Sequence, residues 1–135
     1  MTPFDEPLWF DKEVVKIIHD RQLAEHGGSE GIRNESLLES ALAGGRQLWS
    51  YGNSDLYALA ASYVFGLAKN HPFIDGNKRT AAVICEAFIE IHEMEVKLGE
   101  DAKYHEYLAL ATGEHTEESF GTWLRENSAP RAESS

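Results

Sequence analysis

His71-Pro72-Phe73-Ile74-Asp75-Gly76-Asn77-Lys78-Arg79-Thr80-Ala81 lies between two apolar helical patterns. The first pattern ends at Asn70 and the second begins after Asn77, so the stretch predicts a loop that leads into a helix. Gly76 can adopt backbone angles that are closed to other residues, which suits a tight turn. The free N–H groups and the positive dipole end of the following helix favour an anion beside this loop.

Cationic and amide side chains gather where the second helix begins. Lys78 and Arg79 in a first helical turn oppose the helix dipole, and a bound anion would relieve that conflict. The alternative is that both are ordinary solvated residues. Asn77 and the loop N–H groups offer hydrogen bonds to a phosphate, and Lys69 adds a third cation from the preceding helix. Together these residues predict a phosphate-binding site.

One acid and one histidine add chemistry to this phosphate site. Asp75 is a hard oxygen ligand placed to hold Mg²⁺ beside the phosphates. His71 titrates near neutral pH and can take a proton from a hydroxyl group, although a lone histidine before proline is more often a loop or cap residue. A zinc site would need three or four His, Cys or carboxylate ligands, and the six histidines include no i,i+4 pair on one helix. We therefore expect a site for a nucleoside triphosphate and Mg²⁺.

The length and the net charge of the chain limit the classes of protein to which it can belong. At 135 residues the chain is long enough for one domain with a proper core, which we place at residues 1–127, followed by a disordered tail at 128–135. The net charge of -11, from 12 Lys and Arg against 23 Asp and Glu, argues against binding to nucleic acid or to an anionic membrane. It favours a basic partner, or a small anionic ligand in a local basic pocket.

The sequence also indicates a compartment. No apolar run reaches the roughly 18 residues of a membrane span, and residues 1–11 lack the pattern of a signal peptide. The single cysteine, Cys85, excludes an intrachain disulfide and lies in an apolar helical pattern, where we expect a buried thiol. A cytoplasmic location is expected.

Hydrophobic periodicity predicts an all-α single-domain bundle of about six helices, with at most one short β-hairpin flap. The extended segments are expected at Arg46 to Asn53, which would form the flap, and at Met94 to Leu98. Caps and breakers predict helices from Asp11 to Gly27, from Asn34 to Gly44-Gly45, from Ser54 or Asp55 to Asn70, at 78–93, at 101–111 and at 116–126.

The pattern His71-x-Phe73-x-Asp75-Gly76-Asn77-x-Arg79 resembles the motif of the Fic/Doc superfamily. With Lys78 and Thr80-Ala81 it resembles the Doc branch, the death-on-curing toxins, and the resemblance extends from about His26 to Glu126. It implies a helical bundle whose motif joins two core helices. It also implies His71 as catalytic base, Asp75 as the magnesium ligand, and nucleotide contacts from Phe73, Gly76, Asn77, Lys78 and Arg79.

Position 78 separates two activities within this superfamily. Fic proteins usually have a second glycine there and transfer AMP to a protein hydroxyl. In the Doc branch a lysine accompanies an inverted nucleotide and transfer of the γ-phosphoryl group of ATP or another triphosphate. The target of that branch is a threonine of elongation factor Tu, and its modification halts translation. The resemblance therefore implies a protein kinase-like toxin of a toxin–antitoxin pair.

Two departures from the family patterns bear on that choice. Ala82 stands where AMP-transferring Fic proteins have a second arginine, which favours the Doc activity. Gly76 stands where Doc-type motifs often have alanine, which keeps AMP transfer open as an alternative. A third interpretation is a catalytically silent interaction domain.

Inhibition is expected from a separate small antitoxin. Thr122 to Asn127 fits the inhibitory helix pattern of many Fic proteins, but the arginine that would hold Glu126 is absent, so Glu126 is expected to be solvated. The antitoxin tail should carry basic residues and fold as a helix on an apolar groove. The residues proposed for that groove are Trp9, Phe10, Trp49 and Tyr51.

Overall fold

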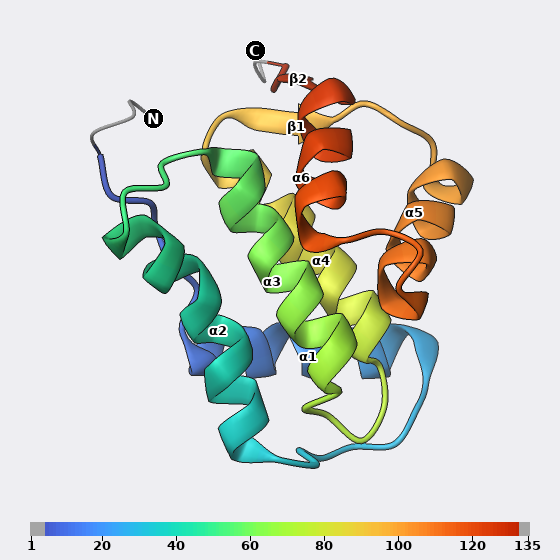
Figure 1. Ribbon diagram of the computed structural model, residues 1–135. Helices are drawn as coiled ribbons and strands as arrows, with labels where there is room; N and C mark the ends of the chain where they lie inside the picture. Colours follow the sequence, from blue (N-terminus) through green and yellow to red (C-terminus); the bar gives the residue numbers. More distant parts are fainter. Residues whose placement is uncertain (1–4, 133–135) are drawn as a thin grey trace.

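The computed structural model describes residues 5–132, and in this range the chain forms six helices and one two-stranded sheet (Figure 1). The all-α prediction is confirmed. The elements in chain order are α1 Lys12–His26, α2 Glu35–Ser50, α3 Leu56–Asn70, α4 Asn77–Ile91, β1 Met94–Val96, α5 Glu100–Thr112, α6 Glu117–Glu126 and β2 Ser128–Pro130.

Side-chain caps fix where the helices begin. Asp11 accepts a hydrogen bond from the Val14 N–H at 2.9 Å and so starts α1. Asn34, Asp55 and Thr116 cap α2, α3 and α6 in the same way. These short polar side chains are why four helix starts could be predicted from sequence.

Helix α3 is the centre of the molecule, with α2, α4 and α6 packed around it (Figure 1). Its buried side chains include Leu59, Tyr63, Val64 and Leu67. Gly66 lets α3 approach α2 closely, because a Cβ at this position would lie 2.8 Å from the Cα of Ala41. Helix α1 lies against α4, which brings the end of α1 beside the loop between α3 and α4.

The predicted flap at residues 46–53 is wrong, because α2 continues through Gly44 and Gly45 to Ser50. These glycines permit close packing instead of ending the helix. A Cβ on Gly45 would lie 3.1 Å from the Trp9 ring, and one on Gly44 would lie 2.5 Å from the Ser62 hydroxyl. Packing at these positions outweighs the low helix propensity of glycine, which costs about 1 kcal/mol relative to alanine.

The two strands pair across the sequence and do not form a hairpin. Strand β1 runs antiparallel to β2, with Met94 opposite Pro130 and Val96 opposite Ser128. Extended structure at Met94–Val96 is confirmed. The expectation of a disordered tail from residue 128 is wrong for Ser128–Pro130, and residues 133–135 lie outside the described part of the chain.

The aromatic residues before α1 pack on the core. Trp9 stacks on Phe88 with ring centroids 5.9 Å apart, and the Phe10 N–H donates to the Tyr63 hydroxyl at 3.0 Å. Trp49, on α2, is also partly buried against the core. The prediction that these three side chains form an uncovered groove is therefore wrong. Tyr51, by contrast, is 90% exposed.

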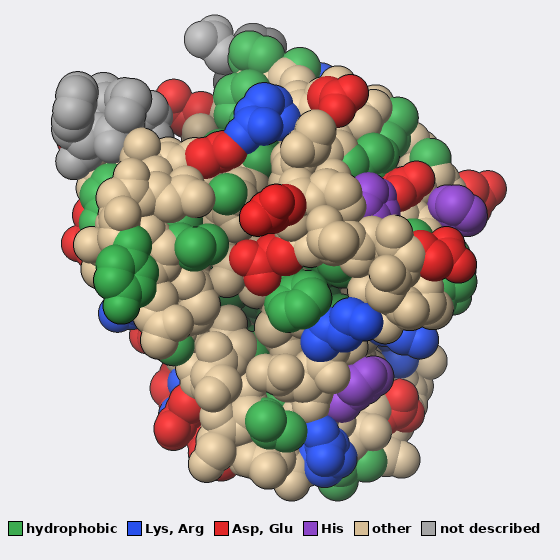
Figure 2. Space-filling view, in the orientation of Figure 1, with side chains coloured by type: hydrophobic (Ala, Val, Ile, Leu, Met, Phe, Trp, Pro, Cys, Tyr) green, Lys and Arg blue, Asp and Glu red, His purple; other side chains and the backbone are tan. Residues whose placement is uncertain are grey.

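Within residues 5–132 no helix is both long and apolar enough to cross a membrane. Figure 2 shows acidic side chains scattered over the face in view, with basic and histidine side chains together near the end where the α3–α4 loop lies. That end carries the motif.

Candidate functional site

The motif loop is closed by the side chain of Asn77, the first residue of α4. Its Oδ1 accepts from the Phe73 N–H at 2.9 Å, and its Nδ2 donates to the Phe73 carbonyl at 2.9 Å. Asn77 is only 7% exposed. This side chain therefore holds the loop closed, and its predicted contact with a phosphate stays a prediction.

Phe73 anchors the loop in the core. Its side chain is 1% exposed and stacks on the imidazole of His19 with centroids 3.7 Å apart. His19, itself 2% exposed, also donates from Nε2 to the Asp75 carbonyl at 2.7 Å, because a carbonyl oxygen can only accept. The buried Phe73 side chain thus positions the loop, and a nucleotide contact from this residue stays a prediction.

Arg33 fixes the start of the loop from the segment before α2. Its Nη2 donates to the Asn70 carbonyl at 2.6 Å and its Nε to the His71 carbonyl at 2.7 Å. These bonds satisfy carbonyls at the end of α3 that have no partner in the helix. The backbone of Arg33 also donates to the Pro72 carbonyl at 2.7 Å. The segment before α2 thus holds the start of the loop through both the side chain and the backbone of Arg33.

The predicted base, His71, lies at the exposed start of this loop. Its backbone is left-handed, with φ 47° and ψ 57°, a conformation in which histidine occurs more often than most residues. The hydrogen bond to Arg33 uses only the backbone carbonyl of His71. The imidazole is therefore accessible to a substrate from solvent.

Asp75, the predicted metal ligand, is also exposed. Its carboxylate accepts from the Ser29 N–H at 3.2 Å and from the Gly76 N–H at 2.8 Å, and these bonds lower the pKa of Asp75. Gly28 permits the approach, because a Cβ on it would lie 2.8 Å from Asp75 Oδ2. Gly76 has the positive φ, 78°, that its predicted turn requires.

This donor set fits Mg²⁺. Each carboxylate oxygen of Asp75 accepts one hydrogen bond and can accept another or bind a cation. Proteins typically hold Mg²⁺ through one or two carboxylates, with substrate phosphates and water completing the octahedron. In the described range no cluster of three His, Cys, Asp or Glu could hold a metal. The ion would therefore have to be shared with phosphate oxygens.

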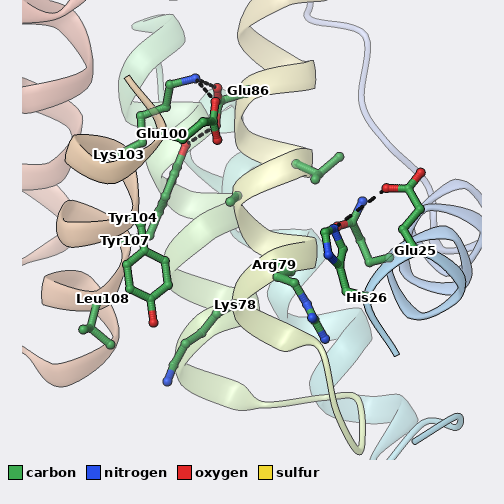
Figure 3. Close-up of a pocket in the computed structure, with 13 residues that line it drawn as sticks. Glu25, His26, Lys78, Arg79, Glu86, Glu100, Lys103, Tyr104, Tyr107 and Leu108 are labelled. Carbon is green, nitrogen blue, oxygen red and sulfur yellow. Dashed lines mark hydrogen bonds and ion pairs between the residues drawn. The ribbon is translucent and has the colours of Figure 1, made fainter. Parts of the chain in front are cut away.

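Lys78 and Arg79 border a cleft of about 410 Å³ between α1, α4 and α5 (Figure 3). Arg79 also donates from Nη2 to the Gly27 carbonyl at 3.2 Å, which ties α4 to the end of α1. The other lining residues are Gln22, Glu25, His26, Ala82, Val83, Glu86, Glu100, Lys103, Tyr104, Tyr107 and Leu108.

The remaining predicted cation lies elsewhere. A Cβ on Gly113 would lie 3.6 Å from Lys69 Nζ, so Lys69 extends toward the turn between α5 and α6. The structure therefore places Lys78 and Arg79 together at one cleft, His71 and Asp75 on the loop before it, and Lys69 outside the cleft lining.

The sequence interpretation missed His19 and Arg33. His19 continues a buried stripe with Val15 and Leu23 at helical spacing, and a histidine in such a stripe was a signal of a buried hydrogen bond. Arg33 gave no signal, since its partners are backbone carbonyls 37 and 38 residues away.

Comparison with known proteins agrees with this geometry. Residues 9–89 match the model of the Fic/DOC family, and the chain therefore belongs to the Fic/DOC family. Within the family it is similar to the protein kinase Doc of Escherichia phage P1, with 30% identity over 70 residues. That match covers 51% of this chain and 56% of the relative, so the chain spans about half the length of the curated relative it matches. The resemblance to the Doc branch is confirmed.

Proposed function

We propose that this chain is the toxin of a toxin–antitoxin pair and transfers the γ-phosphoryl group of a nucleoside triphosphate to a protein hydroxyl. The observation that carries the proposal is that the motif contains both buried residues, which hold the loop, and exposed residues, which can reach a substrate. Phe73 and Asn77 are buried and hold the loop, while His71 and Asp75 stay exposed on it. A loop held in this way, with a histidine and a carboxylate accessible from solvent, is suited to positioning a substrate.

His71 acts as the general base in this proposal. It takes the proton of the acceptor hydroxyl while the hydroxyl oxygen bonds to the γ-phosphorus and the bond from that phosphorus to the β-phosphate oxygen breaks. The nucleoside diphosphate leaves. Lys78 and Arg79, at the first turn of α4, bind the phosphates together with the loop N–H groups near Gly76. Bound at Asp75, Mg²⁺ would neutralise charge on the transferring phosphates.

The proposed target is a threonine of elongation factor Tu, whose phosphorylation would arrest translation. Similarity to a Doc protein kinase supports this choice. Lys78 supports phosphoryl transfer over AMP transfer, since a glycine here would leave space for the backbone to close on an α-phosphate.

A separate antitoxin is proposed as the inhibitor. Glu126 is exposed at the end of α6, whereas the cleft is lined from α1, α4 and α5, so the position of Glu126 does not favour self-inhibition. The net charge of -11 favours a basic antitoxin segment. Growth arrest on expression of the chain alone, equal in wild type and Glu126→Gly, is expected. If Glu126→Gly arrests growth and wild type does not, the chain inhibits its own activity.

The position of the label in ATP distinguishes phosphoryl transfer from AMP transfer. The full chain is incubated with Mg²⁺, elongation factor Tu and ATP labelled on either the γ- or the α-phosphate. We expect label on a threonine from γ-labelled ATP and none from α-labelled ATP. Label from the α-phosphate would instead indicate an AMP transferase. If neither label is transferred to this target or to any protein of a cell extract, the interaction domain is the better interpretation.

A further inference from the structure

A second group of chemically active side chains lies at the turn between α5 and α6, outside the motif loop and the cleft lining. His115 lies in this turn, Glu106 is on α5, and Ser119 is in the first turn of α6. The Nε2 of His115 lies 2.6 Å from a carboxylate oxygen of Glu106, and its Nδ1 lies 2.6 Å from the hydroxyl oxygen of Ser119. One imidazole thus bridges a carboxylate and a hydroxyl group.

The chemistry of the partners sets the direction of each hydrogen bond. An ionised carboxylate only accepts, so the Nε2–H of His115 donates to Glu106. In the neutral imidazole the other nitrogen, Nδ1, then carries a lone pair and accepts from the hydroxyl of Ser119. This order of carboxylate, imidazole and hydroxyl is that of an activated serine, whose base is oriented by a third group.

The capping box of α6 is compatible with this role of Ser119. The hydroxyl oxygen of Ser119 accepts from the Thr116 N–H at 2.9 Å, and the Ser119 N–H donates to the Thr116 hydroxyl at 3.0 Å. The box therefore uses the serine oxygen as an acceptor and leaves the hydroxyl proton for another partner. The Thr116 carbonyl competes for that proton at 3.2 Å, but the Nδ1 of His115 is closer at 2.6 Å.

The base is shielded and the nucleophile is open to solvent. The side chains of His115 and Glu106 are 18% and 26% exposed. The ring of Phe120 packs edge-on against the imidazole, with centroids 5.6 Å apart. Ser119, in contrast, is exposed. A dissolved reagent can therefore reach the hydroxyl while packing keeps the imidazole in place.

The start of α6 also supplies hydrogen-bond donors in the same turn as the hydroxyl. The N–H groups of Glu117 and Glu118 have no acceptor within the helix, because the residues four positions earlier lie before it. Such N–H groups can stabilise the negative oxygen that forms when a carbonyl carbon is attacked. The carboxylates of Glu117 and Glu118 repel an anionic substrate, so the site favours a neutral one.

We propose that Ser119, His115 and Glu106 form a nucleophilic site that hydrolyses neutral carboxylic esters, an activity separate from phosphoryl transfer. The Ser119 oxygen bonds to the ester carbonyl carbon while the Nδ1 of His115 takes the hydroxyl proton. The bond from that carbon to the alcohol oxygen breaks, and the alcohol leaves with the proton from His115. Water then attacks the acylated serine with the same base, which releases the carboxylic acid and restores the hydroxyl. Glu106 is a positioning residue, since it acts through the imidazole.

Labelling with diisopropyl fluorophosphate tests the nucleophile. This neutral reagent forms a stable bond from its phosphorus to an activated serine oxygen and releases fluoride. The full chain is treated without nucleotide or Mg²⁺, and peptide mass measurements give the labelling rate of each serine. Ser36 is the matched control, because it is an exposed serine in the first turn of α2. We expect Ser119 to react about 10²-fold faster than Ser36, which lacks the base.

Two variants remove the partners of the serine. His115→Gln should lower the labelling rate of Ser119 by about 10²-fold or more. Glu106→Gln should lower it by about tenfold or more, and Glu106→Asp, which keeps a carboxylate, should retain more of the rate than Glu106→Gln. His105→Gln is the control, since His105 also approaches Glu106, at 3.6 Å, but is 76% exposed; it should label as wild type does. Thermal melts of the same preparations check folding.

The ester is tested with p-nitrophenyl acetate. Wild type should release p-nitrophenol faster than Ser119→Ala, and equal release by the two would overturn the ester as substrate. An unchanged labelling rate in folded Glu106→Gln would remove Glu106 from the site.

Equal labelling of Ser119 and Ser36, or a wild-type rate in folded His115→Gln, would overturn the nucleophile itself. The three side chains would then serve only to tie α5 to α6. Should His115→Gln not fold, the comparison of Ser119 with Ser36 in wild type decides. Because no step needs a nucleotide, these results are independent of the proposed phosphoryl transfer.

Discussion

The nine residues from His71 to Arg79 contain two sets of side chains in opposite environments. Phe73 and Asn77 are buried and bond or stack within the protein, whereas His71, Asp75 and Lys78 face solvent. Within the buried set, the Asn77 amide makes a pair of hydrogen bonds to the Phe73 backbone. A contiguous sequence motif is thus partly a structural clamp and partly a reactive surface, and the two parts should respond differently to substitution.

The largest effect is expected on the exposed side, at His71. His71→Asn should lower phosphoryl transfer by about 10²-fold or more, because the base is lost. The midpoint of thermal unfolding should not change, since asparagine also tolerates the left-handed backbone of this position. Label transfer and a thermal melt of the same preparation check both. Wild-type transfer by folded His71→Asn would remove His71 as the base.

The next largest effect is expected on the buried side, at Phe73. Phe73→Ala should lower the free energy of unfolding by about 3–5 kcal/mol, the usual cost of emptying a core aromatic site. Its neighbour Ile74, which is 56% exposed, is the matched control, and Ile74→Ala should cost about 0.5 kcal/mol. Urea unfolding measures both. Similar losses at the two positions would mean that the loop is not anchored through Phe73.

A smaller loss is expected from Asn77→Ala. The substitution leaves the N–H and the carbonyl of Phe73 without their partner in a buried loop, which should cost about 2 kcal/mol of unfolding free energy. Lys78→Ala, one residue further on and exposed, should be close to neutral in the same urea titration. A stable Asn77→Ala protein that binds inorganic tripolyphosphate less tightly than wild type would instead place Asn77 in the phosphate site.

The comparison also explains what the sequence could and could not predict. Helix starts at Asp11, Asn34, Asp55 and Thr116 were predictable because an N-cap bond is local, spanning two or three residues. The sequence could not predict which motif residues are buried and which are exposed, since both Asn77 and Asp75 are polar residues typical of turns. Asn77 is buried and Asp75 is exposed, and this difference depends on packing against residues distant in the sequence.

Long-range packing accounts for the other errors. Gly44 and Gly45 indicate a helix end when only neighbouring residues are considered. Their role becomes clear only when Trp9 and Ser62 are placed against them. Likewise β2 carries no strand pattern of its own, and forms because Ser128–Pro130 lies beside β1.

The smallest expected effect on stability is at Asp75, where hydrogen bonds from the Ser29 and Gly76 N–H groups lower the pKa below its ordinary value of 3.8. A depressed pKa in the folded state stabilises the fold above the ordinary value, and this contribution is lost as pH falls through the folded pKa. Asp75→Asn should therefore be slightly less stable than wild type at pH 7, and the difference should shrink in acid. Because Asp75 is exposed, solvent screening keeps the effect small.

Magnesium gives Asp75→Asn a second readout that the hydrogen bonds do not affect. Wild type should bind ATP more tightly when Mg²⁺ is added, and Asp75→Asn should lose this enhancement, because an amide is a far weaker ligand than a carboxylate for a hard cation. Exposed Glu114, on the turn after α5, supplies the control as Glu114→Gln, which should keep both the enhancement and the wild-type dependence of stability on pH. An Asp75→Asn protein that keeps the enhancement while losing the pH-dependent stability would place Asp75 with Asn77, as a residue that holds the loop and leaves the metal to other ligands.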